Sequence, residues 1–346
     1  MWIDNKNTPV YVMDSFLDLS PISIPSNPVL KKMIIRGGTT VLRALRDDWT
    51  TLLLFSSLTV GTEVIYEYLP VQQTALPSLP LGVLITAMSI FLAFQINQSY
   101  DRWWEARRLW GQLVNVSRSL GRQITTLLTD KRIANITNKE SAAKFHQELL
   151  YRHIAFVNIL RISLRSGGKL SEKDWRFMAQ FLPDSEITDL KSAGNVMTQL
   201  LQKQAKVLGA LTGKNWGEQQ ILLQLDSSLN LLNDIQGGCE RIKRSSFPDR
   251  FNFHTRIFVW LLAILIPFCL IENDLFDVVA MITETLLAFL FVTIERLGTE
   301  LRDPFENRIN DTPMSALCRT IEIDLRQQLG ETTTLVPLEP INGVLM

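Results

Sequence analysis

The side chains that most often carry catalysis or bind metals are few in this sequence and widely separated. Among the 346 residues there are three cysteines and three histidines. No CxxC pair or other metal-type spacing links Cys239, Cys269 and Cys318, so neither a zinc site nor a disulfide framework is expected. His146 and His153 could share one face of a helix, but no acidic ligands accompany them, and metal sites need converging ligands. We therefore predict no metal site and no bound cofactor.

The short motifs that mark a phosphate-binding loop or a catalytic nucleophile are incomplete or absent in the sequence. Residues 209–215 superficially suggest a phosphate-binding loop, but the spacing is one residue short, and Asn215 stands where a Ser or Thr should bind magnesium. The sequence contains no nucleophile elbow and no HExxH motif. We therefore predict that the protein is not an enzyme. A formal net charge of zero gives no reason to expect nucleic acid as a partner.

Charge is segregated along the chain, although 20% of the residues are charged and 46% are hydrophobic. Two windows, Asp47–Asp101 and Ile257–Glu295, contain no Lys or Arg. Each window holds two apolar runs near the ~20 residues that span a hydrocarbon core. The runs are Trp49–Leu69, Leu79–Tyr100, Ile257–Ile271 and Leu275–Ile294, of which the third is short and is expected to start near Phe251. They predict four transmembrane helices in two hairpins, with a soluble protein that buries two helical hairpins as the alternative.

Basic residues flank both predicted hairpins, whereas the short hairpin loops contain none. The positive-inside rule then places both termini and the middle of the chain in the cytoplasm. The N-terminus lacks a basic segment followed by an apolar core, so no cleaved signal peptide is expected, and a bacterial inner membrane is favoured. The expected division is a cytoplasmic N-terminal segment, the first hairpin, a cytoplasmic helical region, the second hairpin and a cytoplasmic C-terminal segment: 1–48, 49–101, 102–250, 251–296 and 297–346.

The region between the hairpins is predicted to be helical. Apolar residues recur at three- and four-residue steps from Leu109 to Leu127, which indicates an amphipathic helix that continues from the second span. Further helices are expected at 142–164, 184–209 and 217–244, and no convincing alternating strand pattern appears. The fold class is therefore predicted to be all-α, with four transmembrane helices and a cytoplasmic helical bundle.

The second predicted span carries a regular stripe. Gly82, Thr86, Ile90, Phe94 and Gln98 repeat every four residues and therefore lie along roughly one side of a helix. Such a stripe could line a narrow pore, because a hydrophobic constriction gates by dewetting. One copy of four spans is too small to enclose a conduit, so a pore would need a closed ring of subunits. Ordinary helix packing or lipid contact is the alternative.

Two glutamates fall inside the predicted spans. Glu284 lies deep in the last span, and Glu63 lies late in the first, where it can simply be near the membrane interface. Ionisable groups within a span usually face the interior of a helix bundle or water. Glu284 is therefore the candidate intramembrane polar site, with structural hydrogen bonding as its alternative role.

Four motifs occur in a fixed order along the chain. Residues 91–94 read Phe-Leu-Ala-Phe, and residues 99–107 read Ser-Tyr-Asp-Arg-Trp-Trp-Glu-Ala-Arg before Leu-Trp-Gly. Residues 237–242 read Gly-Gly-Cys-Glu-Arg-Ile ahead of the third span. Residues 300–305 and 310–313, after the fourth span, read Glu-Leu-Arg-Asp-Pro-Phe and Asn-Asp-Thr-Pro. In these motifs and their order, residues 28–330 resemble the bestrophin family, and within it the bacterial and chloroplast-type branch.

This resemblance implies a homopentameric, all-helical ion channel with one central pore. Its neck would comprise Thr86, Ile90 and Phe94 of each subunit, with Thr86 a departure because a bulky apolar residue is more usual there. A second constriction would fall on the aliphatic residue before Leu-Leu-Gln, which is Ile221. Animal members carry a calcium clasp of consecutive acids after Pro-Phe. Here Arg308 and an Ile interrupt the acids, so no clasp of that type is predicted.

The sequence, with this resemblance, therefore predicts passive conduction of chloride and similar monovalent anions across a lipid bilayer by a homopentamer. A cation-conducting bestrophin homologue is the first alternative. An organic-anion transporter is the second, although transporters tend to show internal repeats and broken helices, and the two hairpins share no evident repeat. A membrane-anchored sensor or scaffold is the third, and it predicts no ion flux.

Overall fold

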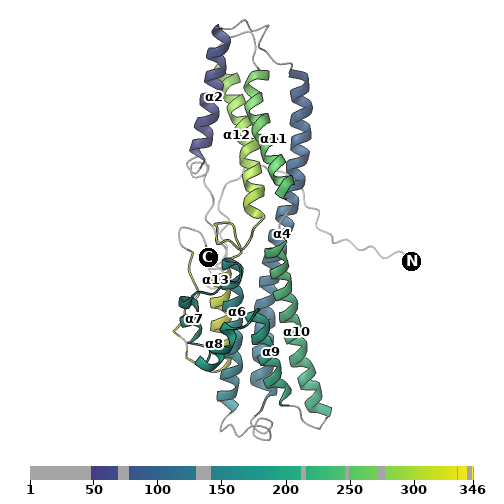
Figure 1. Cartoon of the computed structure of the whole chain (residues 1–346), viewed down its shortest axis with the longest axis vertical. Helices are drawn as coiled ribbons and strands as arrows, with labels where there is room; N and C mark the ends of the chain where they lie inside the picture. Colours follow the sequence, from purple (N-terminus) through teal and green to yellow (C-terminus); the bar gives the residue numbers. More distant parts are fainter. Residues whose placement is uncertain are drawn as a thin grey trace, which may run out of the picture. The chain divides into compact units, whose positions relative to one another are not determined.

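The computed structural model describes residues 48–68, 78–129, 142–211, 216–245, 249–270, 277–332, 334–340 and 345. Within these residues every regular element is an α-helix, which confirms the predicted all-α class for this part of the chain (Figure 1). The helices are α2 (Trp49–Tyr68), α4 (Ser78–Leu127), α6 (Ala142–Ser166), α7 (Glu172–Met178), α8 (Asp184–Lys191), α9 (Val196–Gly209), α10 (Trp216–Arg244), α11 (Asp249–Cys269), α12 (Val278–Leu301) and α13 (Met314–Gln328). Nearly all of the expected N-terminal segment, and both hairpin loops, lie outside the described residues.

The long helix α4 joins two regions that the sequence treats differently. It runs for 50 residues without a break, so the predicted second span continues into the predicted 109–127 helix, as expected. The single helix predicted for 184–209 is wrong, because the chain forms α8 and α9 instead. Asn195 ends the continuity by capping α9, where its side chain accepts the backbone N–H of Thr198 at 3.1 Å.

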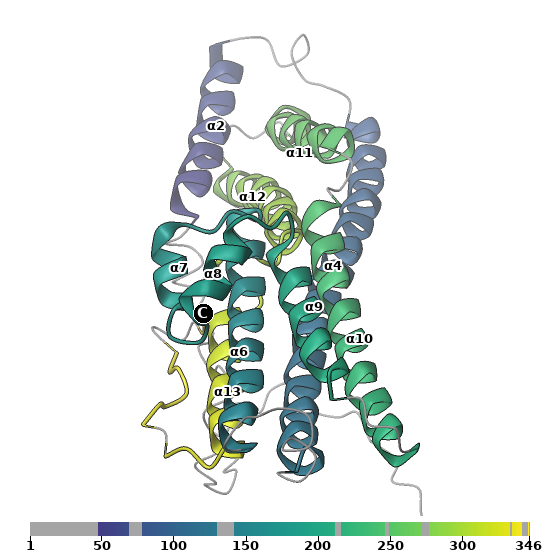
Figure 2. The ribbon, with the colours of Figure 1, turned by 60° about the horizontal axis from the view of Figure 1, so that its bottom comes forward.

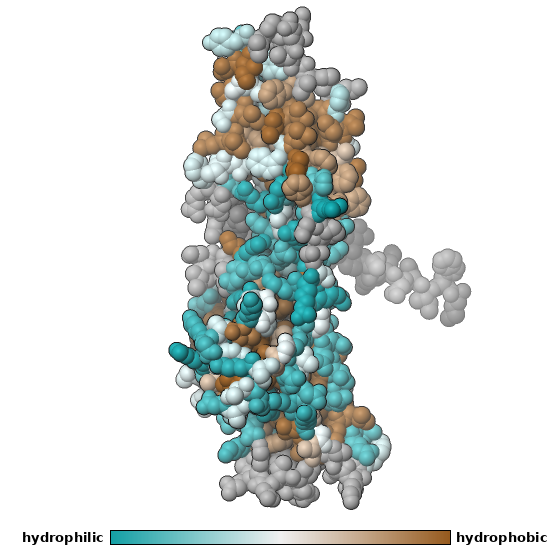
Figure 3. Space-filling model, in the orientation of Figure 1, coloured by the Kyte–Doolittle hydropathy of each residue, from teal (hydrophilic) through white to brown (hydrophobic). Residues whose placement is uncertain are grey.

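One group of helices consists of α2, α11, α12 and the first part of α4, which pack against one another (Figures 1 and 2). On α2 the buried residues follow helical spacing and so form one face: Thr51, Phe55, Thr59, Thr62, Glu63 and Tyr66. The apolar core between these helices includes Phe55, Met88, Leu92, Val259 and Phe291. Outward-facing side chains in this group are largely apolar as well, as the hydrophobic surface in Figure 3 shows.

Three described helices are long and apolar enough to cross a membrane. They are α11, α12 and the part of α4 that begins at Pro80. In α2, Glu63 and Glu67, together with several Ser and Thr residues, lower the hydropathy. Within the described part of the chain, α2 is therefore the predicted span whose composition gives the weakest membrane signal.

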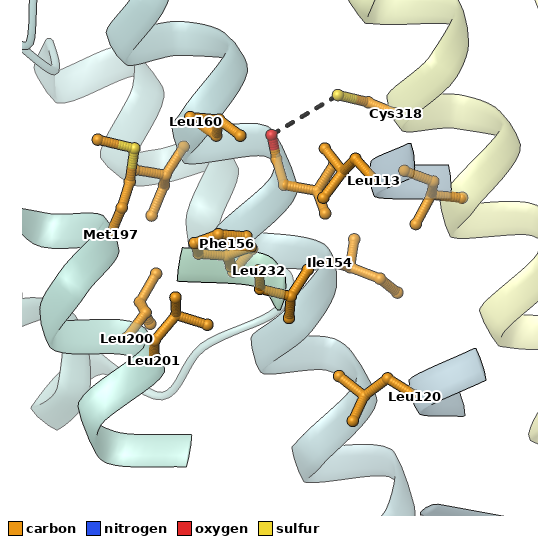
Figure 4. Packing of buried hydrophobic residues seen from close by; sticks show 14 of the residues in the cluster. Leu113, Leu120, Ile154, Phe156, Leu160, Met197, Leu200, Leu201, Leu232 and Cys318 are labelled. Carbon is orange, nitrogen blue, oxygen red and sulfur yellow. Dashed lines mark hydrogen bonds between the residues drawn. The ribbon is translucent and has the colours of Figure 1, made fainter. Parts of the chain in front are cut away.

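The second group packs around the later part of α4. Helices α10, α13 and α6 contact this part of the chain, and α9 packs on α6 and α10. Their shared core contains Trp110, Leu113, Phe156 and Leu232, and Figure 4 shows several of these side chains interdigitating. Cys318 of α13 lies in the same core, where its thiol contacts the carbonyl oxygen of Val157 at 3.7 Å. Such dense apolar packing supplies most of the stability expected of a water-exposed helical domain.

A glycine sets how closely α13 approaches α4. A Cβ placed on Gly121 would lie 1.9 Å from Oε1 of Gln328 and 2.6 Å from a methyl carbon of Leu325. Any larger residue at this position would therefore require the Gln328 and Leu325 side chains to move. The segment after α13 follows without regular structure, and Glu331 at its start accepts hydrogen bonds from Tyr151 and Gln147 at 3.1 Å each.

Candidate ion pathway

One face of the first part of α4 is buried against other helices, and the opposite face is exposed. Leu81, Met88 and Leu92 are buried, as are the polar residues Gln95 and Ser99. These positions are three or four residues apart, so they form a single buried face against α11 and α12. The predicted neck stripe lies on the remaining surface, where all five of its residues are exposed: Gly82, Thr86, Ile90, Phe94 and Gln98.

The two apolar residues of the predicted neck are more than half exposed in the single chain. Ile90 is 53% exposed and Phe94 is 60% exposed, although both belong to a strongly apolar helix. Large exposed apolar side chains mark contact with lipid, with another protein surface, or with a pore that the single chain does not enclose. The structure thus leaves Ile90, Phe94 and Thr86 together on one unoccupied side of α4.

Thr86 and its neighbour Ser89 use their hydroxyl protons within the helix. The Thr86 hydroxyl donates to the carbonyl of Gly82 at 2.9 Å, and the Ser89 hydroxyl donates to the carbonyl of Ile85 at 2.8 Å. Side chains that bond back to the preceding turn in this way are common where no water is available. The Thr86 hydroxyl therefore presents no free hydrogen-bond donor on this side of α4.

The position of the neck residues depends on α12 behind them. Gln95, directly after Phe94, is buried against Gly298 of α12. A Cβ on Gly298 would lie 3.4 Å from Ile96 and 3.7 Å from Gln95. These are ordinary van der Waals distances to side-chain atoms, so Gly298 lies where α12 packs closely against the buried side of α4.

Ile221, the predicted aperture residue, lies in the second turn of α10. It is half-buried and packs against the core of the second helical group. Leu223, two residues later, is 61% exposed, and Gln224 is also exposed. Within the Ile-Leu-Leu-Gln motif, Leu223 is therefore the apolar side chain that points most clearly away from the chain, which sequence reasoning did not single out.

Glu284 is buried between α12 and α2. The residue is 1% exposed, and neither of its carboxylate oxygens has a hydrogen-bond partner among the described residues. Glu63 of α2 is 4% exposed, so within the chain it lies in the helix interface. The next residue on α12, Thr285, contacts Thr59 of α2 through their hydroxyl oxygens at 3.3 Å. Both predicted intramembrane glutamates thus belong to one polar layer between two helices.

The motif at residues 99–107 has a structural role in α4, where it joins this helix to later segments of the chain. The indole N–H of Trp103 donates to the carbonyl of Asn310 at 2.7 Å, which ties α4 to the loop after α12. Arg102 donates to the carbonyl of Ile242 at the end of α10. The motif therefore connects α4 to two later segments, a role that no spacing rule in the sequence reveals.

The loop between α12 and α13 is closed by its own backbone. The Asp311 carboxylate accepts the backbone N–H of Arg308 at 3.0 Å, and Asn307 adopts a left-handed conformation with φ of 67°. Burial raises the pKa of Asp311, while hydrogen bonds from the backbone of Arg308, Glu306 and Asn307 act in the opposite direction. Among the described residues no three His, Cys, Asp or Glu side chains converge as metal ligands, here or elsewhere.

The remaining candidate nucleophiles and bases are core residues. His153 is buried and hydrogen-bonded to the hydroxyl of Ser117 at 2.8 Å, and burial lowers its pKa to about 4. Burial raises the pKa of both Cys239 and Cys318 to about 12, so these thiols stay protonated and unreactive. His146 bonds the carbonyl of Leu128. These contacts agree with packing roles for these side chains.

Long apolar helices and an exposed apolar stripe, beside a second helical group with a polar surface, are typical of a helical integral membrane protein. Over residues 25–327 the chain matches the family described as Bacterial/Fungal Bestrophin protein. The chain belongs to this bestrophin family.

Relatives and solved structures agree with this assignment. The chain is 29% identical over 307 residues to the Voltage-dependent anion channel-forming protein YneE of Escherichia coli (strain K12), covering 89% of this chain and 93% of that protein. It is 28% identical over 264 residues to the Voltage-dependent anion channel-forming protein sll1024 of Synechocystis, covering 74% and 77%. A crystal structure of a bacterial bestrophin homologue from Klebsiella pneumoniae superposes with a TM-score of 0.69 at 25% identity, covering 82% of this chain and 98% of that chain.

Proposed function

We propose that this chain is the subunit of a passive anion channel that conducts chloride and similar monovalent ions. Five copies would surround one central pore, with both termini and the α6–α10 region in the cytoplasm of a bacterial cell. All four of α2, the first part of α4, α11 and α12 would cross the inner membrane. The names of the relatives, which describe voltage-dependent anion channel-forming proteins, support the ion class.

The observation that carries the proposal is the exposed stripe on α4. Ile90 and Phe94 face away from every described helix of their own chain, although the opposite face of the same helix is fully packed. A ring of such stripes would form an apolar neck in which water and ions face a dewetting barrier. Thr86 would make one end of this neck more polar and wider.

Selectivity for anions would come from groups on α4 rather than from a bound cofactor. The edge of an aromatic ring carries partial positive charge, so Phe94 rings whose edges meet the axis would favour an anion. No Lys or Arg occurs between Asp47 and Asp101, so no fixed positive charge of this segment can replace that effect. Ions would then cross the cytoplasmic region and leave past Ile221.

The test is the current through purified protein in a planar bilayer under a salt gradient. Reversal near the chloride equilibrium potential is expected, and reversal near the cation potential would replace the anion assignment by cation conduction in the same fold. The double variant Ile90→Ala with Phe94→Ala should raise the single-channel current several-fold by removing the apolar barrier. Phe91→Ala is the matched control, because Phe91 is equally large and exposed but lies on another side of α4 beside Phe251.

A second pair of variants tests the aperture. Ile221→Ala should raise the current if Ile221 lines the exit, whereas Leu223→Ala should leave it unchanged. The opposite result would move the aperture to Leu223, whose side chain is the more exposed of the two. Equal currents from both variants and the unaltered protein would remove the second constriction from this proposal.

A further inference from the structure

A cavity lies on the side of α13 that faces away from α4. Toward α4, Leu325 and Gln328 of α13 lie against Gly121. On the other side of α13, three charged residues at three- and four-residue steps line a cavity of about 330 Å³: Arg319, Glu322 and Arg326. The end of α7 and the segment after α13 complete its wall, and Figures 1 and 2 show these parts on one side of the helical group. The volume falls within the range of small-molecule sites, roughly 300–1,000 Å³.

The wall of this cavity is held in place by contacts between side chains. The rings of Phe177 and Phe181 meet edge to face with their centroids 5.6 Å apart, and Phe181 meets Tyr151 in the same way at 6.1 Å. The Arg326 guanidinium lies 4.9 Å from the centre of the Tyr151 ring and donates to its hydroxyl oxygen at 2.7 Å. The Tyr151 hydroxyl in turn donates to the carboxylate of Glu331 at 3.1 Å. The aromatic and charged parts of the wall are therefore one connected structure.

One of the four charged residues of the cavity has no partner. Arg326 donates to Glu322 and to Glu331 at 3.1 Å each, so these three residues form a group with one excess negative charge. Arg319, the fourth, is half-buried and takes part in no hydrogen bond or ion pair with the residues that the structure describes. Its planar guanidinium lines the cavity with donors that match the geometry of a carboxylate.

The surroundings of Arg319 favour one class of anion. The excess negative charge of the neighbouring group repels a second negative charge, so a singly charged anion suits the cavity better than a dianion such as phosphate. Phe177 and Phe181 line the cavity with aromatic surface, and Gln180 and Thr332 add uncharged polar groups. Chloride, a single atom, would leave this aromatic surface uncovered. The combination suits an organic acid with one carboxylate and an apolar body.

We infer that this cavity binds a small organic monocarboxylate, whose carboxylate pairs with Arg319 and whose apolar part lies against Phe177 and Phe181. A ligand in this position contacts the end of α7, α13 and the segment after α13 at once, so its binding joins three parts of the second helical group. The site contains no residue of the exposed stripe on α4, so it stands whether or not the chain conducts anions.

The test is the binding of benzoate to the full-length protein in lipid nanodiscs, measured by saturation-transfer difference NMR with empty nanodiscs as the blank. Benzoate carries one carboxylate on an aromatic ring, and benzamide has nearly the same shape without the charge. Benzoate should bind saturably, and benzamide should bind about tenfold more weakly or less, because it lacks the charge-assisted hydrogen bonds to the guanidinium. Inorganic phosphate at the same concentration should leave most of the benzoate bound.

Variants at Arg319 identify the site. Arg319→Gln should weaken benzoate binding about tenfold or more, for the same reason that benzamide binds weakly. Arg319→Lys keeps the charge but not the planar pair of donors, so its affinity should be intermediate. Both variants should fold, since Arg319 has no partner among the described residues, and thermal unfolding checks this. Arg176→Gln is the matched control and should bind benzoate normally, because Arg176 precedes Phe177 in α7 but is exposed and does not line the cavity.

The double variant Ile90→Ala with Phe94→Ala separates this site from the proposed pore, and it should bind benzoate as the unaltered protein does. Loss of binding in that variant would overturn the inference, as would undiminished binding in Arg319→Gln. The absence of saturable benzoate binding, equal binding of benzamide, or displacement of benzoate by phosphate would overturn it as well. None of these outcomes bears on the reversal potential, which tests the anion channel separately.

Discussion

The two helical groups differ in the surroundings of their buried glutamates. In the second group, built around the later part of α4, the Arg152 guanidinium donates to both oxygens of Glu186 at 2.9 and 3.1 Å, and Glu186 is 6% exposed. In the membrane group, Glu284 is buried even more deeply, but its carboxylate oxygens have no described partner. The buried Glu295 of α12 does have a basic partner, Arg256 of α11 at 3.3 Å, whereas Glu284 lies deeper in a stretch, Ile257–Glu295, that contains no Lys or Arg.

The two parts of α4 also differ in how far the chain buries their apolar side chains. Its later part buries Trp110, Leu113 and Leu120 completely within the chain. Its first part leaves Ile90 and Phe94 more than half exposed. The apolar side chains of the later part are therefore covered by the chain itself, while those of the first part need lipid or further copies of the chain to cover them.

The largest expected effect comes from breaking the buried ion pair. Glu186→Ala should lower the free energy of unfolding by about 3–5 kcal/mol, because Arg152 would remain largely buried without its carboxylate. The measurement is thermal unfolding of purified protein in detergent. The control is Glu172→Ala, which breaks the exposed Lys191–Glu172 pair and should cost less than about 1 kcal/mol. Equal losses from both variants would remove the distinction between buried and exposed pairs.

A smaller loss is expected where α13 crosses α4. Gly121→Ala should destabilise the protein by about 1–3 kcal/mol, since the new methyl group overlaps Gln328 and Leu325. Gly237→Ala in α10 is the matched control, because a Cβ there meets no atom within 4 Å. The control should stabilise the helix by about 0.5–1 kcal/mol. A neutral Gly121→Ala would show that α13 can shift outward without cost.

The buried histidine should make stability depend on pH. The pKa of His153 is lowered to about 4 in the folded protein, so the unfolded chain binds the proton more strongly. Stability is therefore complete above the unfolded pKa of about 6.5 and declines as the pH falls toward 4, by about 2 kcal/mol between pH 7 and pH 5. His153→Gln should remove this part of the dependence in thermal unfolding measured at both pH values. An unchanged slope in that variant would assign the dependence to other groups.

The smallest effect on stability is expected at Thr86. Thr86→Val should change the free energy of unfolding by less than about 0.5 kcal/mol, because the side chain is exposed and its hydroxyl bonds only its own helix. The single-channel current should nevertheless fall, since a uniformly apolar stripe raises the dewetting barrier. Ser89→Ala, which removes a hydroxyl bonded in the same way, is the control and should leave the current unchanged.

Helix positions followed closely from the sequence where apolar spacing was regular. The predicted 142–164 and 217–244 helices correspond to α6 and α10 within a few residues. The split between α8 and α9 was missed, because the cap at Asn195 interrupts a stretch whose apolar spacing alone looks continuous. The short α7 was not predicted either, although its capping box at Ser171 and Asp174 was visible as Ser-x-x-Asp.

The sequence by itself determined the membrane character, the all-helical class and the residues of the stripe, because these depend on local composition and on the 3.6-residue period of a helix. Only the tertiary structure decided which side of each helix is covered. It buried Glu63 beside Glu284, turned Ile90 and Phe94 outward, and placed Ile221 partly in the core while exposing Leu223. Such facts depend on contacts between residues far apart in the chain, and no periodicity within one helix specifies which partner its faces will meet.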